Sequence, residues 1–284
     1  MRLTKIYPML IKTCSVTLDC TLSFKEHLAD VSSKVTKRCN LLKRLAGNRW
    51  GADFTALRTT GLALCYSSAE YCPPIWSQST HCKKVDVSFN ECMRLISGCI
   101  KFTPTDILPI LIGVEPPNIR RDKNTLDLRN RALSHNHMLS NLITNPLLNS
   151  RLKSRSPLSL RMNLIANGDN GIISSQALAN EKWETRWNAS EHQLKQFIPS
   201  PSSKPPGCDL KRSEWVLLNR FRSGYGRFAG FMYRIGLSNN PYCLCGEIQT
   251  AQHVLNCQRI GIQGDIKSVD DDFKNWLRFT TLDI

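Results

Sequence analysis

Three cysteines and one histidine lie within fifteen residues, in the stretch CLCGEIQTAQHVLNC at positions 243 to 257. Thiolates and imidazole nitrogens are the ligands that zinc prefers in proteins, and four of them complete its tetrahedral coordination. A zinc ion with four protein ligands has no open position for water, so its role would be structural rather than catalytic. The spacing predicts a structural zinc site at Cys243, Cys245, His253 and Cys257.

The alternative for this cluster is three buried cysteines and a core histidine. Cys243 and Cys245 are separated by one residue, which is tighter than the commoner two-residue spacing. Gly246 follows directly and is free to take the positive φ that a turn around a metal needs. His253 and Cys257 are four residues apart, so a helical turn would place them on one face.

No catalytic constellation accompanies the cluster. Polymerases and nucleases hold two metal ions between clustered carboxylates. The only run of adjacent acidic residues is Asp270 to Asp272, in a polar segment without a strand-turn-strand pattern, and we interpret it as a solvated loop. Phosphate-loop and GxSxG motifs are also missing from the sequence. We therefore expect no catalytic magnesium site and no small-molecule substrate.

The composition is that of a basic globular protein. The 284 residues include 38 Lys and Arg against 23 Asp and Glu, a net charge of +15, which favours RNA or DNA as a partner. The N-terminus shows no secretory signal, and the longest apolar run, ILPILIGV at 107–114, is far shorter than the ~20 residues of a membrane span. The expectation is an intracellular protein of the nucleus or cytoplasm, with no membrane partner.

Hydrophobic periodicity predicts a mainly α chain with a short N-terminal strand through Val16 and Leu18. Ser23 and Glu26 have capping-box spacing and predict the start of a helix. Its apolar stripe is expected at Phe24, Leu28, Val31, Val35, Leu42 and Leu45. Further helices are expected at 54–71, at 81–98 with Val85, Phe89, Met93 and Ile96 as core, and after Pro116 and Pro117.

The second half of the chain is less regular. Residues 145–175 lack periodicity and predict a loop or a partly disordered segment, and IPSPSSKPPG at 198–207 predicts a flexible linker. The predicted order is a strand-bearing segment at 1–22, a helical region at 23–144, a loop and linker region with a short helix at 145–210, and a basic segment with the zinc module at 211–284.

A family resemblance runs through the chain in ordered blocks. LLKRLAGNRWGADFTALRTTGLALCYSSAEYCPPIWSQSTHCKKVDVSFNECMRLISGCIKFTP, residues 41–104, resembles the region after the polymerase palm in jockey-like non-LTR retrotransposon reverse transcriptases. VTLDCTLSFKEHL before it, ILPILIGVEPPNIRR after it, and LNRFRSGYGR with the Cys/His cluster are similar to successive parts of the same family. These blocks cover about two thirds of the chain.

The resemblance implies a truncated piece of an RNA-directed DNA polymerase. It would contain the end of the palm, a helical thumb-like bundle and a C-terminal zinc knuckle, whereas the endonuclease and the palm carboxylates would lie upstream. The Tyr-Leu-Gly-Val lead-in of the family is replaced here by Thr13, Cys14, Ser15 and Val16. We therefore expect no polymerase activity from this chain by itself.

Eight basic residues are predicted to contact nucleic acid, mostly through phosphates rather than bases. The resemblance places Lys43, Arg44 and Arg58 in thumb-like blocks and Arg220, Arg222 and Arg227 before the knuckle, and the basic helix after Pro117 adds Arg120 and Arg121. Tyr225, Phe228 and Tyr242 are candidates for stacking on unpaired bases, although each fits a core position equally well.

Two other functions are compatible with the same residues. The first is a non-enzymatic nucleic-acid-binding or assembly module that a host has adopted from such an element. The second is an inert helical protein whose positive charge has no specific use. The salt dependence of nucleic-acid binding separates the inert protein from the other two, because each phosphate contact releases counterions.

Overall fold

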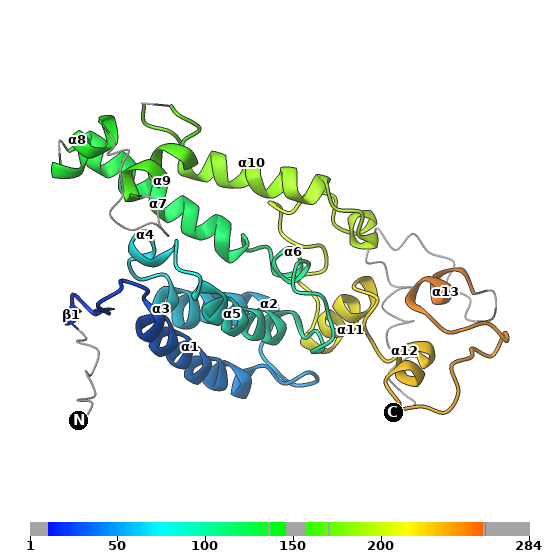
Figure 1. Ribbon diagram of the computed structural model, residues 1–284. Helices are drawn as coiled ribbons and strands as arrows, with labels where there is room; N and C mark the ends of the chain where they lie inside the picture. The colour runs from blue at the N-terminus through cyan, green and yellow to red at the C-terminus, as the bar shows by residue number, and fades with distance from the viewer. Residues whose placement is uncertain (1–10, 136, 146–156, 170, 258, 260–284) are drawn as a thin grey trace, which may run out of the picture. The chain divides into compact units, whose positions relative to one another are not determined.

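The computed structural model describes residues 11–135, 137–145, 157–169, 171–257 and 259. It is mainly α, as the sequence predicts, and its one named sheet has two strands (Figure 1). Strands β1 (Ile11–Thr13) and β2 (Val16–Leu18) form an antiparallel hairpin with Thr13 opposite Val16. The predicted strand at Val16–Leu18 is confirmed, and β1 adds a partner that the sequence pattern did not show.

The described chain forms two compact units, each built from three separate stretches. Unit 1 contains the residues up to Arg38, Leu64–Phe89 and Glu115–Thr185, and unit 2 contains Cys39–Ala63, Asn90–Val114 and the residues from Arg186 onward. The four consecutive segments suggested by the sequence stay a prediction.

Helix α1 (Lys25–Leu45) begins close to the predicted position. Asp19 accepts the backbone N–H of Ser23, and the Ser23 hydroxyl accepts the N–H of Lys25, so free donors at the helix start have partners. Of the predicted apolar stripe, five side chains are buried: Phe24, Leu28, Val31, Val35 and Leu42. Leu45, the last residue of the helix, is 47% exposed and is the exception.

The second predicted helix is divided into three consecutive segments. Helix α2 (Phe54–Gly61) is capped by Asp53, whose carboxylate accepts the N–H of Ala56. A π-helical turn, η1 (Leu62–Tyr66), and the short α3 (Ser67–Ala69) continue it. Helix α4 (Pro73–Trp76) then starts at the two prolines that were expected to end the run.

Helices α5 (Cys82–Ser97) and α7 (Pro117–Ser134) follow the sequence pattern closely. All four predicted core positions of α5 are buried, and Gly98 ends the helix with a φ of 74°. The short α6 (Leu108–Ile112) lies between them in the chain, and all of its residues are buried.

Unit 1 also contains α8 (Met138–Thr144), α9 (Leu158–Ile165) and most of α10 (Ser175–Asn188). The prediction of a loop over 145–175 is wrong at α9. Met162 packs with Ala132 and Ile143, and Ile165 packs with Leu126, so α8 and α9 lie against α7 (Figure 1). This helix is therefore stabilised by its neighbours rather than by a periodic pattern of its own.

Unit 2 ends in η2 (Gln193–Gln196), α11 (Arg212–Arg222), α12 (Ala229–Arg234) and α13 (Ala251–Asn256). Trp215 of α11 is fully buried, with its ring 4.6 Å from that of Phe54. The proline-rich segment 198–207 is anchored by hydrogen bonds from Trp187 Nε1 to the Ile198 carbonyl and from Arg222 Nη1 to the Pro206 carbonyl.

Side chains of α11 satisfy the carbonyl groups at the C-terminal end of α5. Arg212 donates to the carbonyls of Leu95 and Ile96 at 2.7 Å each, and Trp215 Nε1 donates to Ile96 at 3.2 Å. Two further α11 side chains reach the next two carbonyls, from Asn219 to Ser97 and from Arg220 to Gly98. Because a helix leaves its last carbonyls without helical partners, α11 acts as a cap built from side chains.

Candidate metal centre

A tight turn brings the first two cysteines of the cluster together. The N–H of Gly246 donates to the carbonyl of Cys243 at 2.9 Å, and the N–H of Cys243 donates to the carbonyl of Glu247 at 2.7 Å. Gly246 has a φ of 94°, which a side-chain-bearing residue rarely adopts. Tyr242 and Ile248 pair as an antiparallel bridge that closes the turn.

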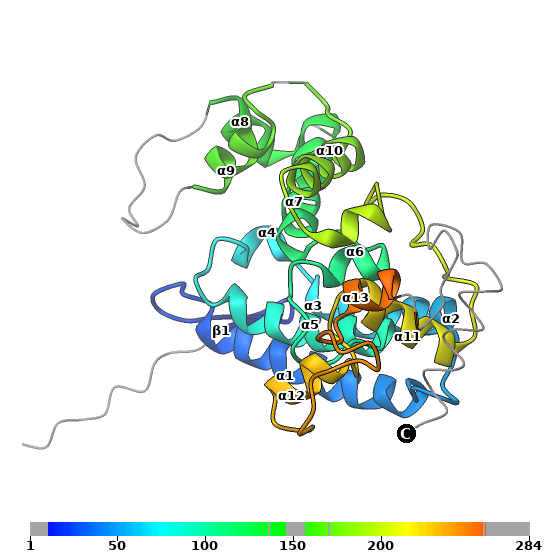
Figure 2. The same ribbon diagram turned by 90° about the vertical axis from the view of Figure 1, so that its right-hand side faces the viewer.

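Helix α13 brings the other two members. The Thr250 hydroxyl accepts the N–H of His253 at 3.0 Å and caps the helix, and Cys257 is the residue directly after it. Ala251 and Val254 pack with Leu218 and Phe221 of α11, as the placement of α11 and α13 in Figures 1 and 2 illustrates. The apolar face of α13 thus rests on the core of unit 2.

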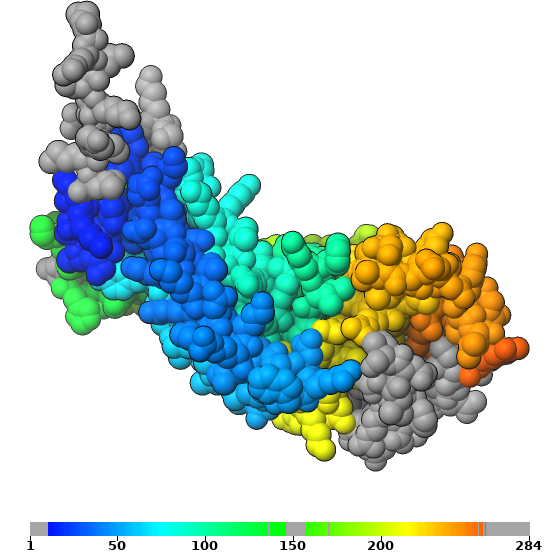
Figure 3. Space-filling model, turned by 90° about the horizontal axis from the view of Figure 1, so that it is seen from below, coloured from blue at the N-terminus to red at the C-terminus, as the bar shows by residue number. Residues whose placement is uncertain are grey.

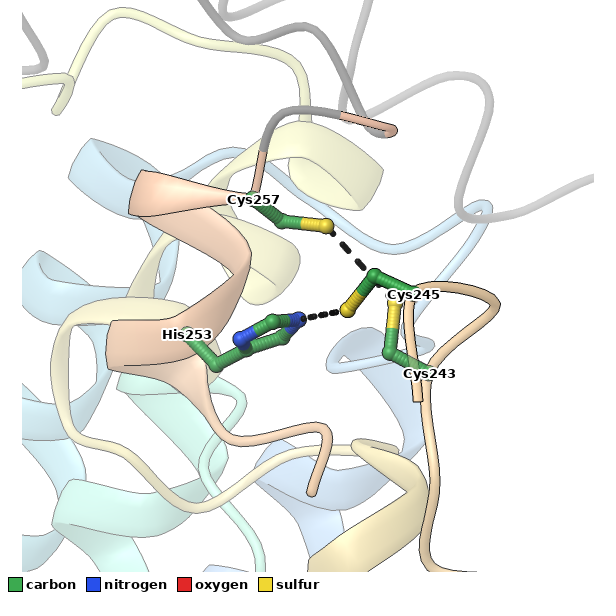
Figure 4. Close-up of side chains that lie close together, drawn as sticks. All are labelled: Cys243, Cys245, His253 and Cys257. Atoms are coloured by element: carbon green, nitrogen blue, oxygen red, sulfur yellow. Dashed lines mark hydrogen bonds between the residues drawn. The ribbon is translucent and has the colours of Figure 1, made fainter. Parts of the chain in front are cut away.

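The four side chains converge on one another and could hold a metal ion (Figure 4). Their ligand atoms all lie within 4.8 Å of one another, with Cys243 Sγ 3.8 Å from Cys257 Sγ and Cys245 Sγ 3.2 Å from His253 Nε2. In a zinc tetrahedron, bonds of about 2.3 Å to sulfur and about 2.1 Å to nitrogen separate two sulfurs by about 3.8 Å and a sulfur and a nitrogen by about 3.6 Å. The sulfur–sulfur separation matches this geometry, whereas the sulfur–nitrogen separation is shorter than the tetrahedron requires.

Glu247 orients the histidine, a role that the sequence analysis missed. His253 Nδ1 lies 2.8 Å from a carboxylate oxygen of Glu247, so the other ring nitrogen, Nε2, points at the cysteines. Histidines that bind metals commonly donate their second N–H to a carboxylate, which sets the tautomer. A glutamate between the ligands in CLCGEIQ is the signal that would have indicated it.

Hydrogen bonds within the cluster shift the pKa values of Cys243, Cys245 and His253, and only the shift at Cys243 favours a metal-binding form, because metals bind thiolates and neutral imidazoles. The backbone N–H of Cys245, together with His253 and the other thiols, lowers the pKa of the Cys243 thiol to about 7. Contacts with Cys243 first, and with Cys257 and Glu247, raise the pKa of His253 above its ordinary value. The thiolate is the form of cysteine that binds metal, so the pKa of Cys243 agrees with the geometry.

Three curated relatives match most of this chain. A Pol polyprotein from the type-1 retrotransposable element R1 of Bradysia coprophila is 20% identical over 250 residues, or 84% of the chain. Two R1 Pol polyproteins of Nasonia vitripennis are 23% and 22% identical over 82% and 86% of it. The chain is a relative of R1 retrotransposon Pol polyproteins. The resemblance to non-LTR retrotransposon proteins predicted from the sequence is thereby confirmed.

The chain spans only part of these relatives. It covers 23% of the length of the Bradysia coprophila protein and 54% and 59% of the lengths of the two Nasonia vitripennis proteins. No family model matches the chain, and no solved structure matches it. Among the residues that the structure describes, no helix has both the length and the apolar character needed to cross a bilayer.

Two of the basic residues predicted to contact phosphates form ion pairs inside unit 1. Arg120 bonds to Glu70 at 2.5 Å and to Glu115 at 2.9 Å, and its guanidinium lies 5.3 Å from the centre of the Tyr66 ring. Burial opposes the charge of Arg120, but the hydrogen bond and charge of Glu70 outweigh it and raise its pKa. Arg121 is buried and bonds to Asp86 at 2.6 Å, so both guanidiniums have carboxylate partners within the fold.

Replacing Arg120 by alanine is expected to lower the free energy of unfolding by about 2–3 kcal/mol, because two largely buried carboxylates, those of Glu70 and Glu115, lose their closest cation. Arg131→Ala, which removes an exposed cation from the same helix, is the matched control and should cost less than about 0.5 kcal/mol. Urea unfolding measures both. Unchanged stability in Arg120→Ala together with weaker nucleic-acid binding would instead support the original phosphate contact.

Three predicted contact residues of unit 2 donate to backbone carbonyls. Arg58 donates to Ile112 and Gly113 at 3.0 and 2.8 Å, Arg220 donates to Gly98 at 2.9 Å, and Arg222 donates to Pro206 at 2.9 Å. Arg222 is 1% exposed, and its guanidinium lies 5.0 Å from the centre of the Trp215 ring. Burial lowers its pKa to about 9. Arg222 therefore has no surface to offer a phosphate in this structure.

Lys43, Arg44 and Arg227 are the predicted contact residues with exposed side chains. Helix α1, whose last turn contains Lys43 and Arg44, is visible on the face of the molecule shown in Figure 3. Of the predicted stacking residues, Tyr242 is 56% exposed, whereas the rings of Tyr225 and Phe228 contact other aromatic rings. The acidic run at 270–272 lies outside the described residues.

Proposed function

We propose that this chain is part of an RNA-directed DNA polymerase of a non-LTR retrotransposon. Its 284 residues contain no recognisable cluster of palm carboxylates, retain nucleic-acid-binding elements, and bind RNA or DNA mainly through phosphates. The observation that carries the proposal is the relationship to R1 Pol polyproteins over 82–86% of the chain. In this view the Cys/His cluster is a zinc knuckle that orders the end of unit 2.

The charge distribution supports a polyanionic partner. Among the described residues of unit 2, basic side chains outnumber acidic ones by more than two to one, whereas the two kinds are nearly balanced in unit 1. Lys43, Arg44 and Arg227 are exposed members of the basic set in unit 2. The zinc supplies no chemistry in this proposal, because its four protein ligands leave no position for substrate.

Salt titration tests nucleic-acid binding. The affinity for a single-stranded RNA is expected to fall steeply with salt, and the double variant Lys43→Ala/Arg44→Ala should reduce the slope of log K against log salt by about 1.4, or about 0.7 for each lost phosphate contact. Lys25→Ala/Lys204→Ala removes two other exposed cations and is the matched control, with an expected slope close to that of the unaltered chain. A slope near zero in the unaltered chain would contradict the proposal and favour an inert helical protein.

A primer-extension assay tests the absence of catalysis. With RNA or DNA template and magnesium or manganese, no nucleotide incorporation is expected, because two-metal catalysis needs clustered carboxylates that we do not find in this sequence. Incorporation that survives removal of contaminating polymerases would show that the chain carries an active centre. A host-adopted module would also bind nucleic acid without incorporating nucleotides. Retained expression in the host would distinguish that alternative from the proposed function.

A further inference from the structure

An aromatic group lies on unit 2 outside the metal centre. The ring of Phe231, in α12, is 5.8 Å from the ring of Phe102 and 5.8 Å from the ring of Tyr225, and both contacts are edge-on. Phe231 is buried, Tyr225 is half-buried and Phe102 is 58% exposed. Segments far apart in the sequence thus meet in one group that presents an aromatic ring to solvent.

The turn that carries Phe102 is held at both ends. Arg220 donates to the carbonyl of Gly98 at 2.9 Å, and Arg94 donates to the carbonyl of Thr103 at 3.1 Å. Within the turn, the N–H of Thr103 donates to the carbonyl of Ile100 at 3.1 Å. An exposed ring on a fixed turn loses little conformational entropy when a ligand covers it, so the exposure of Phe102 suits binding.

Basic residues accompany the aromatic group in space and in sequence, with Lys101 next to Phe102 and Arg227 two residues after Tyr225. Lys101, Arg227 and Arg234 are exposed, and the guanidinium of Arg234 lies 5.2 Å from the centre of the Phe231 ring. Asp106, four positions after Phe102, is the nearest acidic residue to it in the sequence, and no Asp or Glu lies between Glu214 and Glu247. An exposed ring beside exposed cations complements a ligand that is both flat and anionic.

We propose that Phe102, Tyr225 and Arg234, which pack on the buried ring of Phe231, form a stacking platform for unpaired bases of single-stranded RNA or DNA. Lys101 and Arg227 contact the phosphates of the same strand. Aromatic rings and guanidinium groups stack on the faces of unpaired bases with little sequence preference, whereas a duplex keeps those faces covered. The platform deepens the proposed function, on which it rests, by assigning a single-stranded ligand to a surface other than the zinc cluster.

The test compares Phe102→Ala with the unaltered chain on a twelve-nucleotide oligouridine and on a duplex of the same length. Phe102→Ala is expected to weaken oligouridine binding about tenfold, to leave duplex binding unchanged, and to keep the slope against salt, because stacking releases no counterions. Phe102→Trp should restore the affinity. Trp50→Ala removes another exposed aromatic ring of unit 2 and is the matched control, with no change expected.

Photocrosslinking supplies a second measurement. An oligonucleotide containing 5-iodouracil is expected to crosslink to Phe102 or Tyr225, which peptide mapping would identify. Normal oligouridine binding by Phe102→Ala, or an equal loss on duplex, would overturn the platform and leave the proposed function standing. Absence of any nucleic-acid binding by the unaltered chain would overturn both. Thermal melting of Phe102→Ala checks the fold, which the loss of an exposed ring should leave intact.

Discussion

Replacing Cys257 by alanine is expected to remove zinc from the purified chain and to unfold α13 and the turn at 243–247. Structural zinc contributes ~10 kcal/mol or more of apparent binding free energy, and a helix of six residues is not stable by itself. Metal analysis should show one zinc per unaltered chain and none per Cys257→Ala chain. Limited proteolysis should cut the variant near 243–257, while the helices of the rest of unit 2 stay protected.

Two further variants serve as comparisons for this experiment. One changes a cysteine that is not among the four ligands, and the other changes the carboxylate beside His253. Cys208→Ala changes a half-buried cysteine that is not part of the cluster, and it should keep the zinc. Glu247→Gln should retain zinc but lose it to a chelator about 10- to 100-fold more readily, because the carboxylate that orients His253 is gone. Stoichiometric zinc in both His253→Ala and Cys257→Ala would show that the four ligands are wrongly assigned.

The second large effect is expected at Arg212, which the sequence analysis did not single out. Arg212→Ala should lower the free energy of unfolding by about 3 kcal/mol or more. Its guanidinium is buried and donates to Leu95 and Ile96 at the end of α5, and more weakly to Gly47 at 3.4 Å. Without it, the carbonyl of Leu95 loses its donor from α11, the carbonyl of Ile96 keeps only Trp215, and each lost buried hydrogen bond costs about 1–3 kcal/mol.

Urea unfolding followed by circular dichroism would measure this loss. Lys211→Ala, which changes the exposed neighbour, is the matched control and should stay within about 0.5 kcal/mol of the unaltered chain. Arg212→Lys should recover only part of the stability, because one ammonium group cannot reproduce the planar fork that spans two carbonyls. Equal stability of Arg212→Ala and Lys211→Ala would show that α11 does not act as a cap for α5.

The burial of the Arg212 charge explains why its hydrogen bonds contribute strongly to stability. Burial, with a smaller contribution from the charge of Arg220, lowers the pKa of Arg212 to about 10. The backbone carbonyls of α5 are therefore the groups that hold this cation, and they lie at the negative end of the helix dipole. The interaction stabilises both partners, since the carbonyls also lack helical donors.

The sequence by itself determined the local features of this protein. Periodic apolar residues predicted α5 with its buried face, paired prolines predicted the start of α7, and Gly98 predicted the end of α5. The cysteine and histidine spacing predicted which side chains would gather into a cluster that could hold a metal ion. These signals are short-range, because helical periodicity, turn geometry and ligand spacing depend on residues a few positions apart.

Only the tertiary structure decided what the basic side chains do. A sequence shows that Arg120 and Arg222 are charged, but not that Glu70 lies beside the first or that the second is buried near Trp215. The same holds for α9, whose helical state depends on packing against α7 and α8. Partners distant in the chain determine whether a cation binds carboxylates, carbonyls or solvent, and folding alone brings those partners together.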